Sequence, residues 1–181
     1  MFEASAKVIY NRKIKKGYFE IALSTPDIAG SALPGQFVNI KVSDGLEPLL
    51  RRPLSIHKTK EKNKIVMLYE ILGKGTKMLS RRKSGEYLDI IGPLGNGFRI
   101  TNHNSRFTIL VAGGMGTAPL VFLAEKLREV KSQKAPPQKL AGPPISMAEK
   151  VKMLVLIGAK TEDHILCEKE FRELGCEVKI A

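Results

Sequence analysis

The chain of 181 residues contains no tryptophan and only two cysteines, and aromatic residues make up just 6% of it. Its longest apolar runs, at 109–116 and 153–159, fall far short of the ~18 residues that a membrane-spanning helix requires. Two thiols are too few for an all-cysteine zinc or iron–sulfur site. Glu3 and Lys7 interrupt any signal peptide, so we expect a cytoplasmic protein with reduced thiols and no membrane association.

Acidic residues are in the minority: 30 Lys and Arg outnumber 18 Asp and Glu, which gives a formal charge of +12. Such a surplus is typical of proteins that bind nucleic acids. The cations are scattered through predicted turns and helix faces, however, and few aromatic side chains are present to stack on bases. We therefore expect a solvated basic surface and no nucleic-acid partner. A basic β-barrel that binds nucleic acid is a distant alternative, which steeply salt-dependent binding would reveal.

The first half of the chain predicts antiparallel β-structure, because apolar residues alternate or form short β-rich runs between Gly and Pro turns. Six strands at this spacing are typical of a small closed barrel. We also expect Thr76 to cap a short helix at Lys77–Arg82. The candidate strands are Ala4–Asn11, Tyr18–Ser24, Gln36–Val42, Pro53–His57, Lys64–Tyr69 and Glu86–Ile91.

After residue 105 strands and helices alternate, which predicts a parallel α/β unit. The expected domains are therefore 1–100 and 106–181. Residues 131–150 hold four prolines and are expected to form an exposed, inserted loop. Ala181 falls inside a predicted strand, so we expect the native polypeptide to be longer. The expected elements are the strands Phe107–Ala112, Met153–Ile157 and Val178–Ala181 and the helices Ala118–Val130 and Glu162–Leu174.

Two adjacent arginines, Arg51 and Arg52, precede the short predicted strand Pro53-Leu54-Ser55-Ile56. A guanidinium group can grip a pair of phosphate oxygens, and Ser55 can face the polar edge of a heterocycle. Neighbouring side chains on an extended segment point to opposite sides. One arginine is therefore expected to contact a ligand and the other a salt-bridge partner or solvent. A plain surface pair before an edge strand is the alternative.

Two glycine-rich turns precede predicted helices. Gly73-Lys74-Gly75-Thr76 follows the strand that ends in Tyr69, and its unpaired N–H groups favour a phosphate near an aromatic face. Gly113-Gly114-Met115-Gly116 lets a ligand approach the backbone closely. It is not a GxGxxG fingerprint, because Pro119 takes the third glycine position, and a simple tight turn is the alternative.

Taken together, Leu50-Arg51-Arg52-Pro53-Leu54-Ser55-Ile56, Gly73-Lys74-Gly75-Thr76, Gly92-Pro93-Leu94-Gly95-Asn96-Gly97-Phe98 and 112–120 resemble the ferredoxin-reductase-like flavoproteins. Within that family the resemblance is to the electron transfer subunits of dihydroorotate dehydrogenase B. It covers nearly the whole chain except the proline-rich insertion. The implied fold is a six-stranded antiparallel FAD-binding β-barrel followed by a partial Rossmann-like nucleotide-binding domain.

The resemblance implies an oxidoreductase in pyrimidine biosynthesis in which FAD takes hydride from NADH. Electrons then pass through a [2Fe-2S] cluster to an FMN-containing dihydroorotate dehydrogenase catalytic subunit, in a hetero-oligomer. Neither a catalytic side chain nor a metal ligand is assigned. The matching cofactor-binding positions are Arg52, Pro53, Leu54, Ser55, Leu68, Tyr69, Glu70, Gly75 and Thr76 for FAD and Gly113, Gly114 and Gly116 for the nucleotide.

Three departures from the family pattern stand out. Leu54 occupies the place of a flavin-stacking tyrosine, and Glu70 stands where a basic residue is common. The resemblance also places the cysteine-rich cluster segment beyond Ala181, so this chain alone is not expected to be active. The corresponding subunits of a ferredoxin:NADP oxidoreductase, a sulfide dehydrogenase or a soluble hydrogenase are close alternatives.

Overall fold

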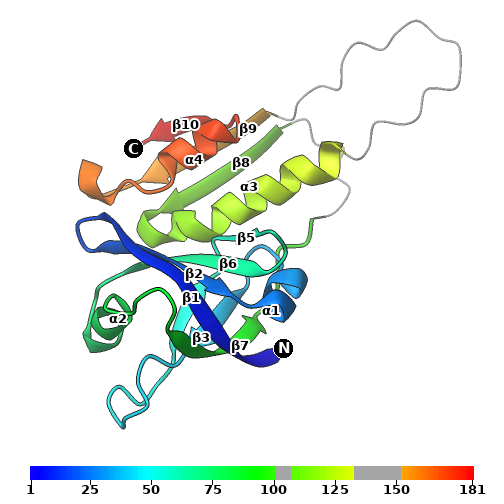
Figure 1. Cartoon of the computed structure of the whole chain (residues 1–181). Helices are drawn as coiled ribbons and strands as arrows, with labels where there is room; N and C mark the ends of the chain where they lie inside the picture. The colour runs from blue at the N-terminus through cyan, green and yellow to red at the C-terminus, as the bar shows by residue number, and fades with distance from the viewer. Residues whose placement is uncertain (101–106, 133–151) are drawn as a thin grey trace, which may run out of the picture.

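The computed structural model describes residues 1–100, 107–132 and 152–181 (Figure 1). The proline-rich segment expected at 131–150 lies outside these ranges apart from its first two residues. Two sheets make up the described structure: an antiparallel sheet of seven strands in the order β4-β3-β7-β1-β2-β6-β5, and a parallel sheet of three in the order β10-β9-β8. The N-terminal part comprises β1 (Phe2–Lys15), β2 (Tyr18–Ser24), α1 (Pro26–Ser31), β3 (Phe37–Ile40), β4 (Arg52–Ser55), β5 (Lys58–Lys60), β6 (Lys64–Glu70), α2 (Lys74–Leu79) and β7 (Tyr87–Leu94).

The antiparallel sheet curls around a core of alternating inward side chains, as in β6, where Ile65, Met67 and Tyr69 are buried. The expected antiparallel architecture is confirmed, but the structure has seven strands in a half-barrel where six in a closed barrel were expected. The additional strand is β5, whose three residues are too short to produce a recognisable alternation.

A single segment spans the two ends of the curled sheet. β4 pairs with β3 and β5 pairs with β6, and the two residues between β4 and β5 donate backbone hydrogen bonds to opposite sides. The Ile56 N–H donates to the Gln36 carbonyl at 3.0 Å, and the His57 N–H donates to the Val66 carbonyl at 2.8 Å. His57 is thereby carried into the interior, where its side chain is 0% exposed.

One short helix, α1, was not expected from the sequence. It begins with Pro26, whose fixed φ suits a first helical position, and it buries Ile28 and Ala29 against the antiparallel sheet. Six residues are too few to display a helical period, so only its packing identifies it.

The C-terminal part is built as strand, turn, helix and strand, as expected. Its elements are β8 (Phe107–Gly113), the 3₁₀ turn η1 (Gly114–Gly116), α3 (Thr117–Ser132), β9 (Lys152–Gly158), the 3₁₀ turn η2 (Glu162–His164), α4 (Glu168–Glu173) and β10 (Glu177–Ile180). β8 and β10 both pair with β9 in parallel. One long helix was expected at Glu162–Leu174, but the chain breaks at Cys167, whose φ of 61° is left-handed, so only α4 is α-helical.

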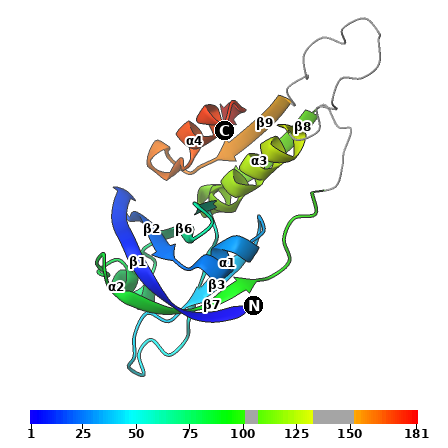
Figure 2. The same ribbon diagram turned by 45° about the vertical axis from the view of Figure 1, so that its right-hand side comes forward.

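Both α3 and α4 cover the same face of the parallel sheet (Figure 2). Leu110, Val155 and Phe171 are buried between these layers. The opposite face carries exposed apolar side chains, with Ile109 53% and Val111 71% exposed. α3 also reaches the antiparallel sheet, because Phe122 is buried in the core of that sheet. Among the described helices, none combines the length and apolarity needed to cross a membrane.

Candidate functional site

A pocket of about 240 Å³ lies where β4, β6 and the start of α2 meet the turn before α3. Its walls come from segments far apart in the sequence, so it exists only in the folded chain. The lining residues are Pro53, Leu54, Ser55, Leu68, Tyr69, Glu70, Leu72, Thr76, Met115 and Ala118. Most of the positions expected to contact FAD therefore share one cavity. Gly113, Gly114 and Gly116 do not line it, although Met115 from the same turn does.

The two adjacent arginines point to different partners, as the extended backbone predicted. Arg51 makes a bidentate contact with Asp89, at 3.0 Å from Nη1 to Oδ1 and 2.7 Å from Nη2 to Oδ2. Hydrogen bonding by Asp89 raises the pKa of Arg51 against the opposing effect of burial. Arg52 instead turns toward Gly75, and among the described residues its guanidinium donates only a long hydrogen bond of 3.5 Å, to the Arg51 carbonyl. Within that part of the chain, Arg51 has a carboxylate partner and Arg52 has none.

Gly75 is buried because the Arg52 side chain lies directly against it. A Cβ atom at position 75 would be 2.2 Å from Arg52 Nε and 2.9 Å from Cζ, closer than atoms can approach. The glycine is therefore needed for the guanidinium to stay in this place, and its backbone angles do not call for a glycine. It lets the guanidinium lie against the first turn of α2, where the backbone N–H groups lack intrahelical acceptors.

Thr76 shapes this turn from inside the helix. α2 begins at Lys74 with Gly73 as its N-cap, so the expected cap of a helix at Lys77–Arg82 by Thr76 was wrong. The Thr76 hydroxyl oxygen accepts hydrogen bonds from the N–H groups of Leu72 (3.0 Å) and Gly73 (3.3 Å). A threonine three residues after the N-cap can reach back in this way. The side chain holds the loop between β6 and α2 against the pocket.

Tyr69 offers the pocket less aromatic surface than its position suggested. The residue is 1% exposed, its ring stacks on Phe19 at 5.6 Å between centroids, and its hydroxyl donates to Asn11 Oδ1 at 2.8 Å. Burial raises the pKa of the phenol to about 12, against the lowering effect of Asn11. The group therefore stays neutral and serves as a fixed wall. Leu54 and Leu68 give the slot its apolar character.

The glycine-rich turn is rigidly joined to α3. Gly114 has a φ of +51°, and the buried Thr117 hydroxyl donates to the Gly114 carbonyl at 2.7 Å. A Cβ on Gly113 would lie 3.3 Å from the Gly158 carbonyl oxygen in the neighbouring strand. A small residue at Gly113 thus serves close packing between the strands, whereas a Cβ added at Gly114 or Gly116 would meet no atom within 4 Å.

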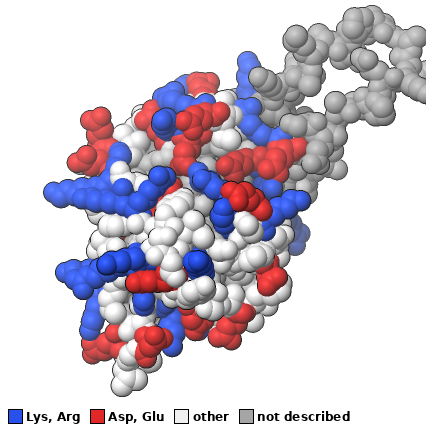
Figure 3. All heavy atoms as spheres, in the orientation of Figure 1, with Lys and Arg blue, Asp and Glu red and all other residues white. Residues whose placement is uncertain are grey.

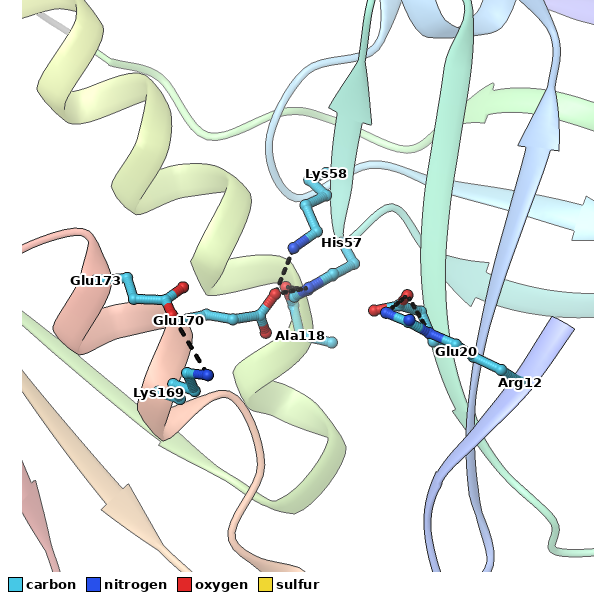
Figure 4. Close-up of polar contacts among 8 residues, drawn as sticks. All are labelled: Arg12, Glu20, His57, Lys58, Ala118, Lys169, Glu170 and Glu173. Atoms are coloured by element: carbon cyan, nitrogen blue, oxygen red, sulfur yellow. Dashed lines mark hydrogen bonds and ion pairs between the residues drawn. The ribbon is translucent and has the colours of Figure 1, made fainter. Parts of the chain in front are cut away.

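Sequence reasoning missed a polar cluster between the two sheets, which contains His57, Lys58, Cys167 and Glu170. Figure 4 shows the Glu170 side chain of α4 directed at His57 and Lys58. Burial would raise the pKa of Glu170, but hydrogen bonds and charge from His57 and Lys58 outweigh it and lower the pKa to about 2. The only available signal was the position of His57, directly after Pro53-Leu54-Ser55-Ile56.

This cluster also has the composition of a metal site. Ligand atoms of His57, Cys167 and Glu170 lie within 4.8 Å of one another. Glu170 is already engaged by His57 and Lys58, however, and burial foremost raises the pKa of the Cys167 thiol to about 12. The observed arrangement is the ion pair of Lys58 and Glu170, with His57 hydrogen-bonded to the same carboxylate and a neutral thiol beside it.

Charges on the face drawn in Figure 3 are mixed, with basic side chains interspersed among acidic ones. Several cations are also neutralised locally, as in the pairs of Lys126 with Glu129 and of Arg172 with Glu168. The described residues on this face form no continuous basic groove of the kind that follows a nucleic-acid backbone.

No family model matches the chain. It is 36% identical over 182 residues to the "Dihydroorotate dehydrogenase B (NAD(+)), electron transfer subunit" of Desulforamulus reducens, a match that covers all of this chain and 61% of the relative. The chain is similar to these electron transfer subunits over its whole length, which confirms the resemblance inferred from the sequence. It spans about 61% of the length of these relatives.

Solved structures with a similar fold are also reductases. An NADH-dependent reduced ferredoxin-NADP oxidoreductase, studied for flavin-based electron bifurcation, superposes with a TM-score of 0.74 at 28% identity, over 98% of this chain and 56% of that one. The ferredoxin-NADP⁺ reductase of Plasmodium falciparum gives 0.71 at 15% identity, over 98% and 70%. The fold is ferredoxin-reductase-like, and its relatives are oxidoreductases that transfer electrons.

Proposed function

We propose that this chain is the FAD-binding part of an electron transfer subunit that passes electrons from NADH to a dihydroorotate dehydrogenase catalytic subunit. The observation that carries the proposal is the meeting of Arg52 and Gly75 beside an apolar slot formed by Leu54 and Leu68. A dinucleotide flavin has both a pyrophosphate and a large flat ring, and the site offers a partner for each. When bound, FAD would accept a hydride and release electrons singly.

The residues present fit that cofactor. Arg52 supplies a charged donor fork for the pyrophosphate, and Gly75 leaves the space in which the guanidinium lies. Thr76 keeps the loop after β6 in place, while Pro53, Leu54 and Ser55 form the wall for the ring. Leu68, Tyr69 and Glu70 form the second wall toward the ribityl and adenosine side. We assign no role to the carboxylate of Glu70 itself.

The nucleotide donor is proposed to approach from the second half of the chain. Because Gly113, Gly114 and Gly116 carry no side chains, NADH could lie close to the backbone of the turn before α3, as in a nucleotide-binding turn. This assignment divides the chain into a FAD-binding domain at 1–100 and a nucleotide-binding domain at 106–181. A phthalate dioxygenase reductase of the same fold transfers electrons from pyridine nucleotides to a [2Fe-2S] centre.

The remaining components belong to the proposed complex. We propose that the [2Fe-2S] cluster is not held by Cys167 and Cys176, because such a cluster needs four ligands. The partner would be the FMN-containing catalytic subunit, and the assembly a hetero-oligomer in pyrimidine biosynthesis. Cys167 and Cys176 are both free thiols, which supports a cytoplasmic location for the proposed complex.

The first test is a comparison of FAD, FMN and riboflavin as ligands, each followed by its fluorescence on titration with the protein. If Arg52 binds the pyrophosphate, FAD is retained best, and Arg52→Ala abolishes that preference without changing riboflavin binding. Lys77→Ala is the matched control, since Lys77 is an exposed cation on α2, the helix that contains Gly75. Equal binding of all three flavins, or none, would overturn the FAD assignment.

A second candidate is the corresponding subunit of a ferredoxin:NADP oxidoreductase, which the 28% identity to such an enzyme favours. The two candidates differ in the acceptor. After reconstitution with FAD, co-purification with a dihydroorotate dehydrogenase catalytic subunit supports the first, and binding to ferredoxin supports the second.

A further inference from the structure

His57 lies between the two sheets and is in hydrogen-bond contact with both α3 and α4. Its Nδ1 is 2.8 Å from the Ala118 carbonyl oxygen, and its Nε2 is 3.1 Å from Oε1 of Glu170 (Figure 4). Each ring nitrogen thus has an oxygen atom within hydrogen-bond distance, one on each helix. The fully buried ring is therefore held between α3 and α4 from opposite sides.

These contacts join the two walls of the pocket. Ser55, two residues before His57, lines the pocket from the antiparallel sheet, and Ala118 lines it from α3. The hydroxyl of Thr117 binds the Gly114 carbonyl, so the glycine-rich turn moves together with the start of α3. The position of His57 thus determines how far the turn stands from the flavin side of the pocket.

The other contacts between the two sheets include apolar packing and hydrogen bonds at the tip of a hairpin. Phe122 packs into the antiparallel core, and Lys15 donates to the carbonyls of Glu162 (3.2 Å) and Ile165 (2.8 Å) at the tip of the β1–β2 hairpin. Apolar burial is non-directional and tolerates sliding. Hydrogen bonds are directional and fix a geometry. Beside the pocket, among the residues that the structure describes, this constraint comes from the His57 contacts together with the ion pair of Lys58 and Glu170.

We propose that His57 and Glu170 are positioning residues, which set the distance between the glycine-rich turn and the flavin pocket. The identity of the hydride donor held by that turn rests on the function proposed above. The position of the turn does not, because it follows from the hydrogen bonds of His57. Without the pair, flavin would still bind to the antiparallel sheet, but the donor would be held at the wrong distance.

The expected effect is kinetic. Hydride transfer requires the reacting atoms to be in near-attack geometry, and a misplacement of about 1 Å can cost up to about 100-fold in rate. Flavin affinity should change little, since Arg52 and Gly75 are not part of the cluster. A merely structural role would instead lower stability and leave the rate of flavin reduction intact in the folded fraction.

The variants are Glu170→Gln, which removes the charge and keeps the shape, and His57→Gln, which removes the imidazole ring. Glu173→Gln is the matched control, because Glu173 lies on the same helix and, among the described residues, pairs only with the exposed Lys169, at 3.8 Å (Figure 4). Each FAD-loaded protein is measured for its FAD dissociation constant, for amide hydrogen exchange in 113–118, and for the rate of flavin reduction at saturating NADH. Since Glu170 is partly exposed, its variant is expected to fold even if the His57 variant does not.

In Glu170→Gln we expect FAD affinity within about twofold of the parent, about tenfold faster exchange in 113–118, and at least about tenfold slower flavin reduction. Glu173→Gln should behave like the parent. Unchanged exchange at 113–118 in Glu170→Gln overturns the proposal, and so does an unchanged reduction rate where the parent is reduced by NADH. If the parent binds FAD but NADH does not reduce it, the proposed electron donor is wrong, and the exchange measurement alone decides the positioning role.

Discussion

The contact between Arg52 and Gly75 predicts that adding one methyl group to the glycine will weaken FAD binding as much as removing the arginine. The Cβ of an alanine at 75 would stand 2.2 Å from Arg52 Nε, so Nε must retreat by about 1.2 Å to reach an ordinary contact of 3.4 Å. The clashing atoms are the far end of a flexible side chain, so the fold should tolerate the change. An alanine is also intrinsically favoured over glycine in a helix, by about 1 kcal/mol.

The loss is expected in binding. A hydrogen bond to a charged group contributes about 1.5 to 3 kcal/mol, which corresponds to about a 10- to 150-fold rise in the FAD dissociation constant. Both Gly75→Ala and Arg52→Ala should show it, in a fluorescence titration with FAD. Because each substitution removes the same contact, the double variant should lose no more than either single one. Gly30→Ala is the control, since that helical glycine has no atom within 4 Å of an added Cβ.

Two results would refute this reasoning. If the losses from Gly75→Ala and Arg52→Ala add up in the double variant, the two residues act independently and the glycine does not position the guanidinium. If Gly75→Ala binds FAD like the parent while Arg52→Ala does not, the guanidinium holds the pyrophosphate from a different position.

Three further predictions concern stability and surface. Glu170 has a pKa of about 2 in the folded protein, so its ionised form stabilises the fold, and this stabilisation is complete above the unfolded pKa of about 4.3. It amounts to at most about 3 kcal/mol and is lost as the pH falls from about 5 to 2. Glu170→Gln should therefore flatten that part of an acid-denaturation curve. Arg51→Ala should lower the free energy of unfolding, measured by urea titration, by about 1 kcal/mol, because its bidentate contact with Asp89 is partly exposed. It should leave FAD affinity, measured by fluorescence, unchanged. A large loss of FAD affinity would contradict the division of roles between the two arginines. The exposed apolar face of the parallel sheet should bind the dye ANS, and Ile109→Lys should reduce that fluorescence; equal fluorescence would mean that the dye binds elsewhere.

Several features of the fold could be predicted because they depend on local pattern. Alternating burial in β6 is visible in the sequence, and so is the change to strand–turn–helix order after residue 105. The opposed roles of Arg51 and Arg52 followed from the geometry of an extended backbone, and the contact of Arg51 with Asp89 confirmed the salt-bridge half of that prediction. The ligand half stays a prediction.

Other features could not be predicted because they depend on residues distant in sequence. His57 and Glu170 are 113 positions apart, and nothing near either residue signals the other. The start of α2 was misplaced for a subtler reason. A threonine before a helix commonly caps it, but Thr76 lies three residues inside and reaches back to Leu72 and Gly73. Gly75 was assigned to phosphate contact, whereas the structure shows that it also makes room for a side chain.

The burial of α3 on two sides has a consequence for how the molecule unfolds. Phe122 belongs to the core of the antiparallel sheet, while Val121, Leu123 and Ala124 belong to the core of the parallel sheet. Neither core is complete without this helix, so melting one exposes apolar surface of the other. The chain should therefore lose both halves in a single cooperative transition, and a ligand bound only to the antiparallel sheet should raise the melting temperature of the parallel sheet equally.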